Sequence, residues 1–139
     1  MTFSVTLPMP PSANAIWRWN GGQGVSKAPK YTAWINEAGW RMNEARAKGL
    51  WKPLAPDTWY WTDMLFSYAH KGDSDNRIKA IHDLLHSMGA TPDDKWLMGG
   101  TYMRSHDLAP DMCQVTARSC PDGPPPGFVT WLPVVGAIR

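Results

Sequence analysis

The sequence has few cysteines, few charged side chains and no long apolar run. Its two cysteines, Cys113 and Cys120, stand seven apart in a segment that predicts a strand. Their side chains are therefore expected on opposite faces and not in a mutual disulfide. No apolar stretch approaches the roughly 20 residues of a membrane span, and the first residues lack the pattern of a secretion signal. We therefore expect a cytoplasmic protein with reduced thiols and no membrane partner.

Tryptophan and proline, in contrast, are abundant, with nine Trp and thirteen Pro in 139 residues. This usage indicates a core of large flat groups joined by stiff loops. A net charge of +2 and a pI near 8.6 are compatible with a polyanionic partner without requiring one. The hydrophobic share of 43% and the charged share of 19% are typical of a folded domain, and the length fits a single one.

The first half of the chain predicts one strand, a loop and one helix. Alternation of Phe3, Val5 and Leu7 with polar residues predicts a strand that the following prolines end. Residues 10–19 are then expected to form a rigid loop, and the glycine-rich residues 20–24 a flexible excursion with a basic end. Apolar residues at helical spacing predict a helix that Gly49 ends. These apolar residues are Tyr31, Trp34, Ile35, Ala38, Met42 and Ala45.

The second half predicts a central strand, a second helix and two further strands. Large apolar side chains stand at both odd and even positions of residues 59–70, which suggests a central strand covered on both faces. A narrow apolar stripe from Ile78 to Met88 predicts a helix that Gly89 ends. A strand broken or bulged at residues 99–100, and a last strand over 112–120, should follow. We expect one α/β (α+β) domain over 1–120 and a tail, 121–139, that packs on this domain or on a second copy.

Two carboxylate pairs flank the second helix. Asp73 and Asp75 precede it and project to the same side of an extended segment, while Asp93 and Asp94 follow it. If the helix folds back, three carboxylates can converge into a site for a hard cation, Mg²⁺ or Mn²⁺. The alternative is that Asp75 caps the helix, Asp73 favours its dipole and the second pair fills an ordinary turn. The local pattern leaves both interpretations open.

The motifs taken together resemble the RusA family of Holliday junction resolvases over about residues 3–118. The resemblance rests on the proline loop LPMPPSANAIWR, the D-x-D-N-x-x-K segment from Asp73 to Lys79, a helical Asp, and a Gly turn leading to Asp-Asp. It implies a small mixed β-sheet with two main helices. It further implies a Mg²⁺-dependent endonuclease, with Mn²⁺ as a substitute, that makes paired symmetric nicks in four-way junctions as a homodimer. The resemblance implies that the protein acts in DNA recombination and repair in the bacterial cytoplasm, and that either the bacterium or a phage encodes it.

The resemblance also assigns roles to individual residues. Asp73, Asp75 and Asp94 become catalytic metal ligands, and Lys79 the functional lysine. Asp93, Asn76 and Asp83 match supporting motif positions, where Asp83 can simply pair with Lys79 and Asn76 can cap the helix.

Residues 69–72 lack the arginine-rich approach of the family. Other bases are therefore expected to bind phosphates, because affinity for DNA sums over such contacts. Our candidates are Arg18, Lys27, Lys30, Lys71, Arg77, Lys95 and Arg104. His82 and His86 have the spacing of a zinc pair, but we expect exposed histidines because no third ligand is evident. Alternative functions are a nuclease for flaps or other branched DNA, a junction-binding protein without catalysis, and a structural domain.

Overall fold

The computed structural model describes residues 1–12, 17–19, 25–69 and 75–125. Two short strands, β2 (Trp17–Trp19) and β3 (Val25–Lys27), pair with each other as an antiparallel hairpin. The other elements are β1 (Thr2–Pro8), α1 (Pro29–Ala47), β4 (Tyr60–Ser67), α2 (Asp75–Ser87), the short 3₁₀ helix η3 (Asp94–Trp96), β5 (Leu97–Ser105) and β6 (Met112–Ser119). The hairpin was not predicted from the sequence.

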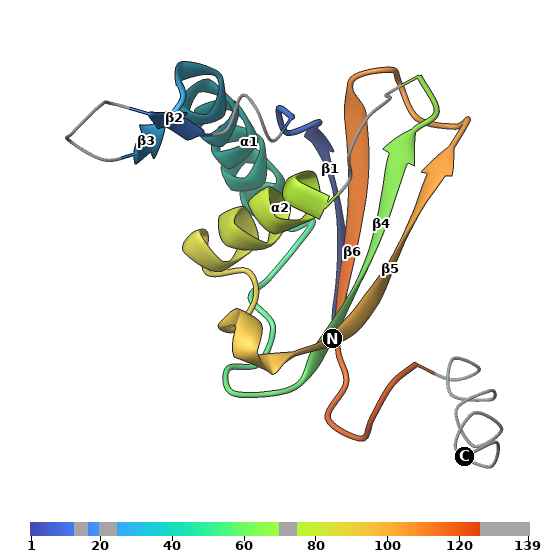
Figure 1. Cartoon of the computed structure of the whole chain (residues 1–139). Helices are drawn as coiled ribbons and strands as arrows, with labels where there is room; N and C mark the ends of the chain where they lie inside the picture. The colour runs from blue at the N-terminus through green and yellow to red at the C-terminus, as the bar shows by residue number, and fades with distance from the viewer. Residues whose placement is uncertain (13–16, 20–24, 70–74, 126–139) are drawn as a thin grey trace, which may run out of the picture.

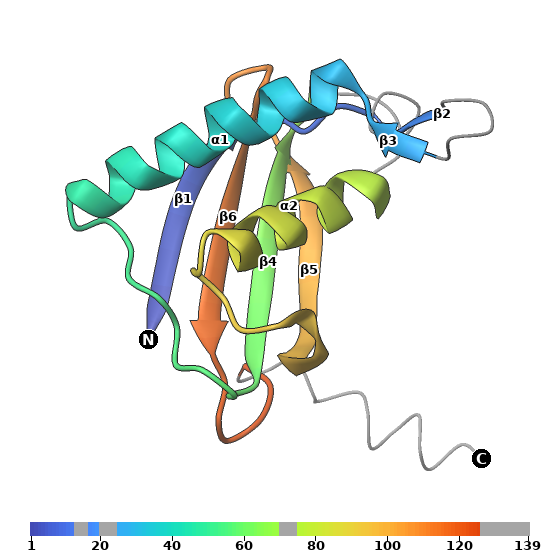
Figure 2. The same cartoon turned by 90° about the vertical axis from the view of Figure 1, so that its left-hand side faces the viewer.

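The main sheet has four strands in the order β1-β6-β4-β5. Strand β6 is antiparallel to both of its neighbours, whereas β4 and β5 run parallel. Both α1 and α2 lie on the same face of this sheet (Figure 1, Figure 2). The predicted fold class, a small mixed sheet with two main helices, is therefore confirmed.

The core fills the space between the sheet and the two helices. Phe3, Val5 and Leu7 are buried as their alternation predicts, and Val5 pairs with Val115 of β6. Burying each such side chain stabilises the fold by about 1.5–3 kcal/mol. Buried tryptophans need a partner for the indole N–H. Trp34 donates to the carbonyl of Pro8 at 2.8 Å, and Trp51 to the carbonyl of Met42 at 2.7 Å.

Strand β4 lies inside the sheet between β6 and β5, as predicted for a central strand, but helices cover only one of its faces (Figure 2). On the face away from α1 and α2, Trp61 is nevertheless only 3% exposed. The reason is Gly99 on β5, which leaves space for the indole ring: a Cβ on Gly99 would lie 2.8 Å from Trp61 Cζ3. The indole N–H of Trp61 also donates to Asp63 Oδ1 at 2.9 Å. The apolar residue on this second face of β4 is therefore buried because its ring packs over the neighbouring strand β5 and not under a helix.

Other differences from the prediction are local. Strand β5 continues through Gly99 and Gly100. Its pairing with β4 shifts register one residue earlier, because Tyr60 pairs with Leu97 and Trp61 with Gly99, which leaves Met98 as the irregular position. Both cysteines are free, as expected, and both are buried. The predicted flexible residues 20–24 and most of the tail, 126–139, lie outside the described residues. The division into a domain over 1–120 and a tail over 121–139 therefore stays a prediction.

Candidate functional site

The candidate site begins where α2 begins. Asp75 is the first residue of the helix and is exposed, as is Asn76 after it. A carboxylate in the first turn is favoured by the positive end of the helix dipole. Asp73 and Lys71 lie outside the described residues, between the end of β4 and this helix. The structure therefore places one member of the first aspartate pair, at the exposed amino end of α2.

Lys79 lies one turn further along α2. Its Nζ is 3.6 Å from Asp83 Oδ1, and the two side chains are 69% and 49% exposed. Such an exposed i,i+4 pair contributes only about 0.3–0.5 kcal/mol. The predicted pairing with Asp83 is thus present, but it is too weak to hold the Lys79 ammonium in place.

The two aspartates of the second pair, Asp93 and Asp94, occupy different positions in η3. Asp93 precedes this helix as its N-cap, and its Oδ1 accepts from the backbone N–H of Lys95 at 3.1 Å. That hydrogen bond, followed by the neighbouring carboxyl of Asp94, lowers the pKa of Asp93. Asp94 is the exposed first residue of η3. Asp93 therefore has a clear structural role in the turn, whereas no such cap engages Asp94.

The helix η3 lies beside the second half of α2. Burial lowers the pKa of His82, while the negative charges of Asp83 and Asp94 oppose that shift. His82 is half-buried rather than exposed, which corrects the prediction, and its Nδ1 has no hydrogen-bond partner in the described part of the chain. His86 is exposed as expected. In the described ranges, no three His, Cys, Asp or Glu side chains are grouped so that they could hold a metal ion.

A pocket of about 200 Å³ separates α2 from β5. We call it the α2–β5 pocket. Its α2 wall begins with Ile78, one turn after Asp75, and its β5 wall begins with Leu97, just after η3. The pocket therefore lies between α2, which carries Asp75, and β5, which follows η3, but neither Asp75 nor Asp94 lines it. Its lining residues are Thr62, Met64, Ile78, His82, Leu97 and the four residues 99–102.

A protein-family model described as Endodeoxyribonuclease RusA matches residues 8–111. The chain belongs to this family. The match begins at the end of β1 and stops just before β6, so it includes both helices and every described candidate residue. No curated protein matched the chain. Membership of this family supports endodeoxyribonuclease activity. In the described ranges, no helix is long and apolar enough to cross a membrane.

The RusA-family chain presents its predicted basic residues in different settings. Arg77 is only 6% exposed, and its Nε donates to the carbonyl of Pro10 at 3.3 Å. This burial does not favour the expected DNA contact, because the guanidinium ties the proline loop to α2. Arg104 is half-buried, with Nη1 3.3 Å from the carbonyl of Ser67 at the carboxyl end of β4. Lys30 and Lys95 are exposed. Arg18 lies on β2 and Lys27 on β3.

The sequence analysis missed two exposed aromatic residues, Tyr102 on β5 and Tyr68 just after β4. Tyr102 on β5 is 57% exposed. Tyr68, just after β4, stacks on His106 with ring centroids 3.7 Å apart and planes at 7°. The alternation of Gly100, Tyr102 and Arg104 could have shown that these residues share one face of β5. It could not have shown that this face is left uncovered at Tyr102.

Proposed function

We propose that this RusA-family protein is a Mg²⁺-dependent endonuclease that resolves four-way DNA junctions by paired symmetric nicks. It would act in recombination and repair, in the cytoplasm of a bacterium, from a host or phage gene. The observation that carries the proposal is the pair of exposed aspartates, Asp75 at the start of α2 and Asp94 at the start of η3, in a chain of an endodeoxyribonuclease family.

The donor set fits a hard cation. Asp73, Asp75 and Asp94 supply carboxylate oxygens, the ligands that Mg²⁺ and Mn²⁺ prefer, and both thiols are buried and free. Asp93 is engaged by the Lys95 N–H, which leaves Asp94 as the ligand from η3. When bound, such an ion neutralises charge on a phosphodiester and makes water a better nucleophile. These three aspartates hold the ion in our proposal.

Lys79 supplies a cation on the same helix as Asp75. Its exposed ammonium is only weakly paired with Asp83, so it can turn toward a phosphate of the bound strand. A positive charge brought to that position stabilises the negative charge that develops on the phosphate during hydrolysis. Asn76 and Asp93 support the two aspartate-bearing turns.

A homodimer follows from the symmetry of the substrate. One site cuts one strand, whereas resolution of a four-way junction requires two cuts at equivalent positions. Two copies related by a two-fold axis place two identical sites on the two equivalent strands. Light scattering of the purified protein is expected to report a dimer.

The decisive experiment incubates the protein with a synthetic four-way junction and Mg²⁺. We expect paired nicks that ligase can reseal. Asp75→Asn and Asp94→Asn should each reduce the cleavage rate by at least about 100-fold, because each removes charge stabilisation from the transition state. Calorimetry with Mn²⁺ should show weaker binding in both variants. Asp122→Asn, an exposed aspartate just after β6, is the matched control and should behave as wild type.

Other outcomes separate the alternatives. Undiminished nicking by Asp75→Asn would exclude the proposed site. Faster cutting of a flap than of the junction would identify a nuclease for other branched DNA. Tight, metal-independent binding without cleavage would identify a junction-binding protein.

A further inference from the structure

Strand β1 forms one edge of the main sheet in the described part of the chain. It pairs with β6 on one side, and no other described strand pairs with it. At the two ends of this pairing, the N–H of Met9 donates to the carbonyl of Asp111 at 2.8 Å, and the N–H of Ser119 to the carbonyl of Met1 at 2.9 Å. Hydrogen-bonded pairs alternate along antiparallel strands, so the odd-numbered residues of β1 bond to β6. The even-numbered residues therefore direct their backbone groups outward.

The outward-directed N–H and C=O groups belong to Thr2, Ser4 and Thr6. These residues are exposed and uncharged, and β1 pairs with β6 without a register shift over its whole length. Native proteins usually protect such an edge with a charged side chain, a bulge or a covering segment. Because β1 has neither of the first two, we expect a segment to cover it.

A groove follows this edge beneath the second half of α1. The helix crosses β1, and its carboxyl end extends past the edge of the sheet (Figure 2). Two pockets of about 320 Å³ and 230 Å³ lie there, the first between Thr6 and α1, the second between Thr2 and the segment that follows α1. Leu50 lines both of them. We call the two pockets together the β1-edge groove, which can receive side chains of a strand placed beside β1.

The lining of the β1-edge groove is apolar and exposed. Met1, Trp40 and Leu50 contribute to it, and each of these large side chains is at least 60% exposed. Lys48 and Glu44 on the helix wall form an ion pair at 2.8 Å, which balances their charges. Exposed apolar side chains that gather around a groove mark a surface that binds another segment. The covering segment should therefore be apolar.

The sequence contains a segment of this kind outside the described residues. Residues 128–135, FVTWLPVV, include no charged residue and no glycine. Aromatic and β-branched side chains favour strands. Pro133 has no N–H, which is compatible with an outermost strand if its nitrogen faces solvent. The even-numbered residues of the segment would then bond to β1.

The segment can reach the groove from its own domain. Cys120 donates its N–H to the carbonyl of Trp59 at 2.8 Å, so the chain leaves the sheet below β4, two strand spacings or about 10 Å from β1. The fourteen residues 126–139 extend to at most about 46 Å. Strand β1, with seven residues, needs about 24 Å. Attachment to the domain gives the segment an effective concentration on the order of millimolar, which favours it over a separate peptide.

We propose that residues 128–135 of the same chain add a fifth strand to the sheet beside β1 and place apolar side chains in the β1-edge groove. The interaction requires neither DNA nor a metal ion, so it goes beyond the proposed nuclease function. It would close the edge at which β1 could otherwise pair with a strand of another molecule.

Residue-resolved amide hydrogen exchange on the full chain tests the proposal. In wild type, the N–H groups of Thr2, Ser4 and Thr6 should exchange at least about tenfold more slowly than in an unstructured peptide, because the added strand bonds them. The double variant Trp131→Glu/Leu132→Glu puts a charge on each face of the segment and should abolish this protection. Leu50→Glu should do the same from the groove side.

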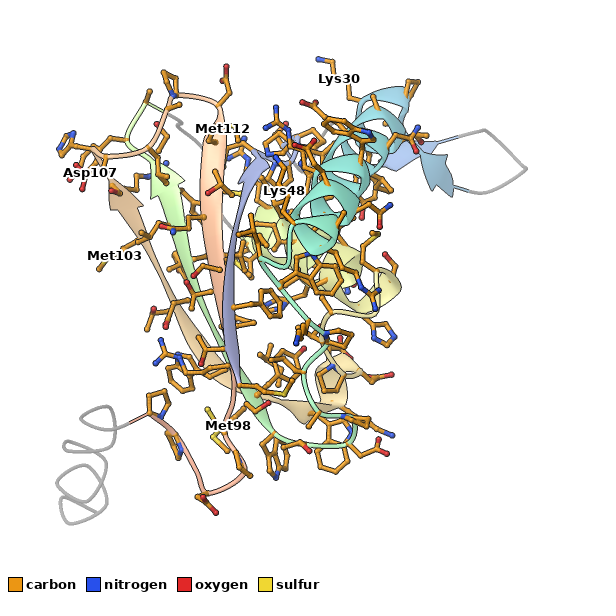
Figure 3. All side chains as sticks on the ribbon, turned by 180° about the vertical axis from the view of Figure 1, so that it is seen from behind. Lys30, Lys48, Met98, Met103, Asp107 and Met112 are labelled. Carbon is orange, nitrogen blue, oxygen red and sulfur yellow. The ribbon has the colours of Figure 1, made fainter. Side chains whose placement is uncertain are left out.

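The odd-numbered residues of β1 provide an internal control. Phe3, Val5 and Leu7 should stay protected in every variant, since their N–H groups bond to β6. Met103→Glu is the matched control variant. Met103 is also 60% exposed, but it lies on the opposite edge strand, β5, and points away from the helices (Figure 3). This variant should leave the exchange of Thr2, Ser4 and Thr6 unchanged.

Three results would overturn the proposal. The first is exchange of the even-numbered β1 amides at the rate of an unstructured peptide in wild type, and the second is protection that survives Trp131→Glu/Leu132→Glu. The third is protection that rises with protein concentration, which would mean that the segment comes from a second copy. None of these results bears on cleavage, so the proposed nuclease function is tested separately.

Discussion

Lys79 and Asp83 form an i,i+4 ion pair on α2, and our proposal gives the two residues unequal importance. Their ion pair spans 3.6 Å between exposed groups, so its loss removes little stability. A catalytic cation at Lys79 would be needed for cleavage whether or not Asp83 is charged. The pair therefore allows a role in stability to be separated from a role in chemistry.

We expect Lys79→Ala to lower junction cleavage by roughly 100-fold, because it removes a charge that stabilises the transition state. Asp83→Asn should leave cleavage within a few fold of wild type. Thermal unfolding should change by less than about 0.5 kcal/mol in both variants, since each removes the same weak pair. Equal loss of cleavage in the two variants would show that the ion pair, rather than the Lys79 ammonium, is what the enzyme needs.

Single residues also show where sequence reasoning reached its limit. The exposure of Asp75 and Lys79 agrees with their absence from the predicted apolar stripe of this helix, because helical spacing determines which residues share a side. Arg77 and His82 could not be placed in this way. The partner of Arg77, the carbonyl of Pro10, is 67 residues away, and His82 is half-buried beside the pocket between α2 and β5. Such burial depends on tertiary neighbours that a local pattern does not contain.

At the scale of elements, two glycines in regular structure differ in the space around them. In α1, a Cβ on Gly39 would lie 3.7 Å from Met88 Sδ, an ordinary contact. In β5, a Cβ on Gly100 would run into the backbone carbonyl of Thr62 on β4. The first glycine is therefore replaceable, and the second is required by the approach of two strands.

Gly39→Ala should raise the free energy of unfolding by about 0.5–1 kcal/mol, because alanine is the better helix former and restricts the unfolded chain. Gly100→Ala should lower it by about 1–3 kcal/mol, since the backbone that it meets must shift. Urea unfolding measures both changes. A stable Gly100→Ala protein would mean that β5 can move away from β4 at little cost.

The elements themselves were largely predictable, whereas the faces they cover were not. Alternation in β1 and β6 and helical spacing in α1 identified the buried side chains, because one face of each is polar. Strand β4 is apolar on both parities for two different reasons, helices on one side and Trp61 over Gly99 on the other. The missed hairpin has strands of only three residues, which is too short for a periodic signal.

At the scale of the whole molecule, one carboxylate joins three strands of the sheet. Asp63 on β4 accepts from Thr101 Oγ1 on β5 at 2.6 Å, and from Arg118 Nη2 on β6 at 2.6 Å. Partial burial acts to raise the pKa of Asp63, but hydrogen bonds from Thr101 and Trp61 and the charge of Arg118 outweigh it and lower the pKa. The ionised form is thus favoured by the fold.

Because the folded-state pKa is lowered, this stabilisation is present above the ordinary Asp pKa near 4 and is lost as the pH falls through the folded value. Asp63→Asn should therefore lower the free energy of unfolding by about 1–3 kcal/mol at pH 7. It should also lose less stability than wild type between pH 4 and pH 2, as measured by urea unfolding. Asp122→Asn serves as control. An equally steep acid loss in Asp63→Asn would assign the acid sensitivity to other carboxylates.

The position of β6 has a consequence for how the protein is made. This strand is the last of the sheet in sequence, yet it lies between β1 and β4, with Val5 paired to Val115. At roughly 5–20 residues per second, a ribosome takes several seconds to reach Met112 after β1 has emerged. Throughout that time β1 lacks β6, the strand with which it pairs in the described part of the chain, so the core closes only after β6 has been made. Synthesis interrupted before β6 should therefore yield an unfolded chain and not a partly active nuclease.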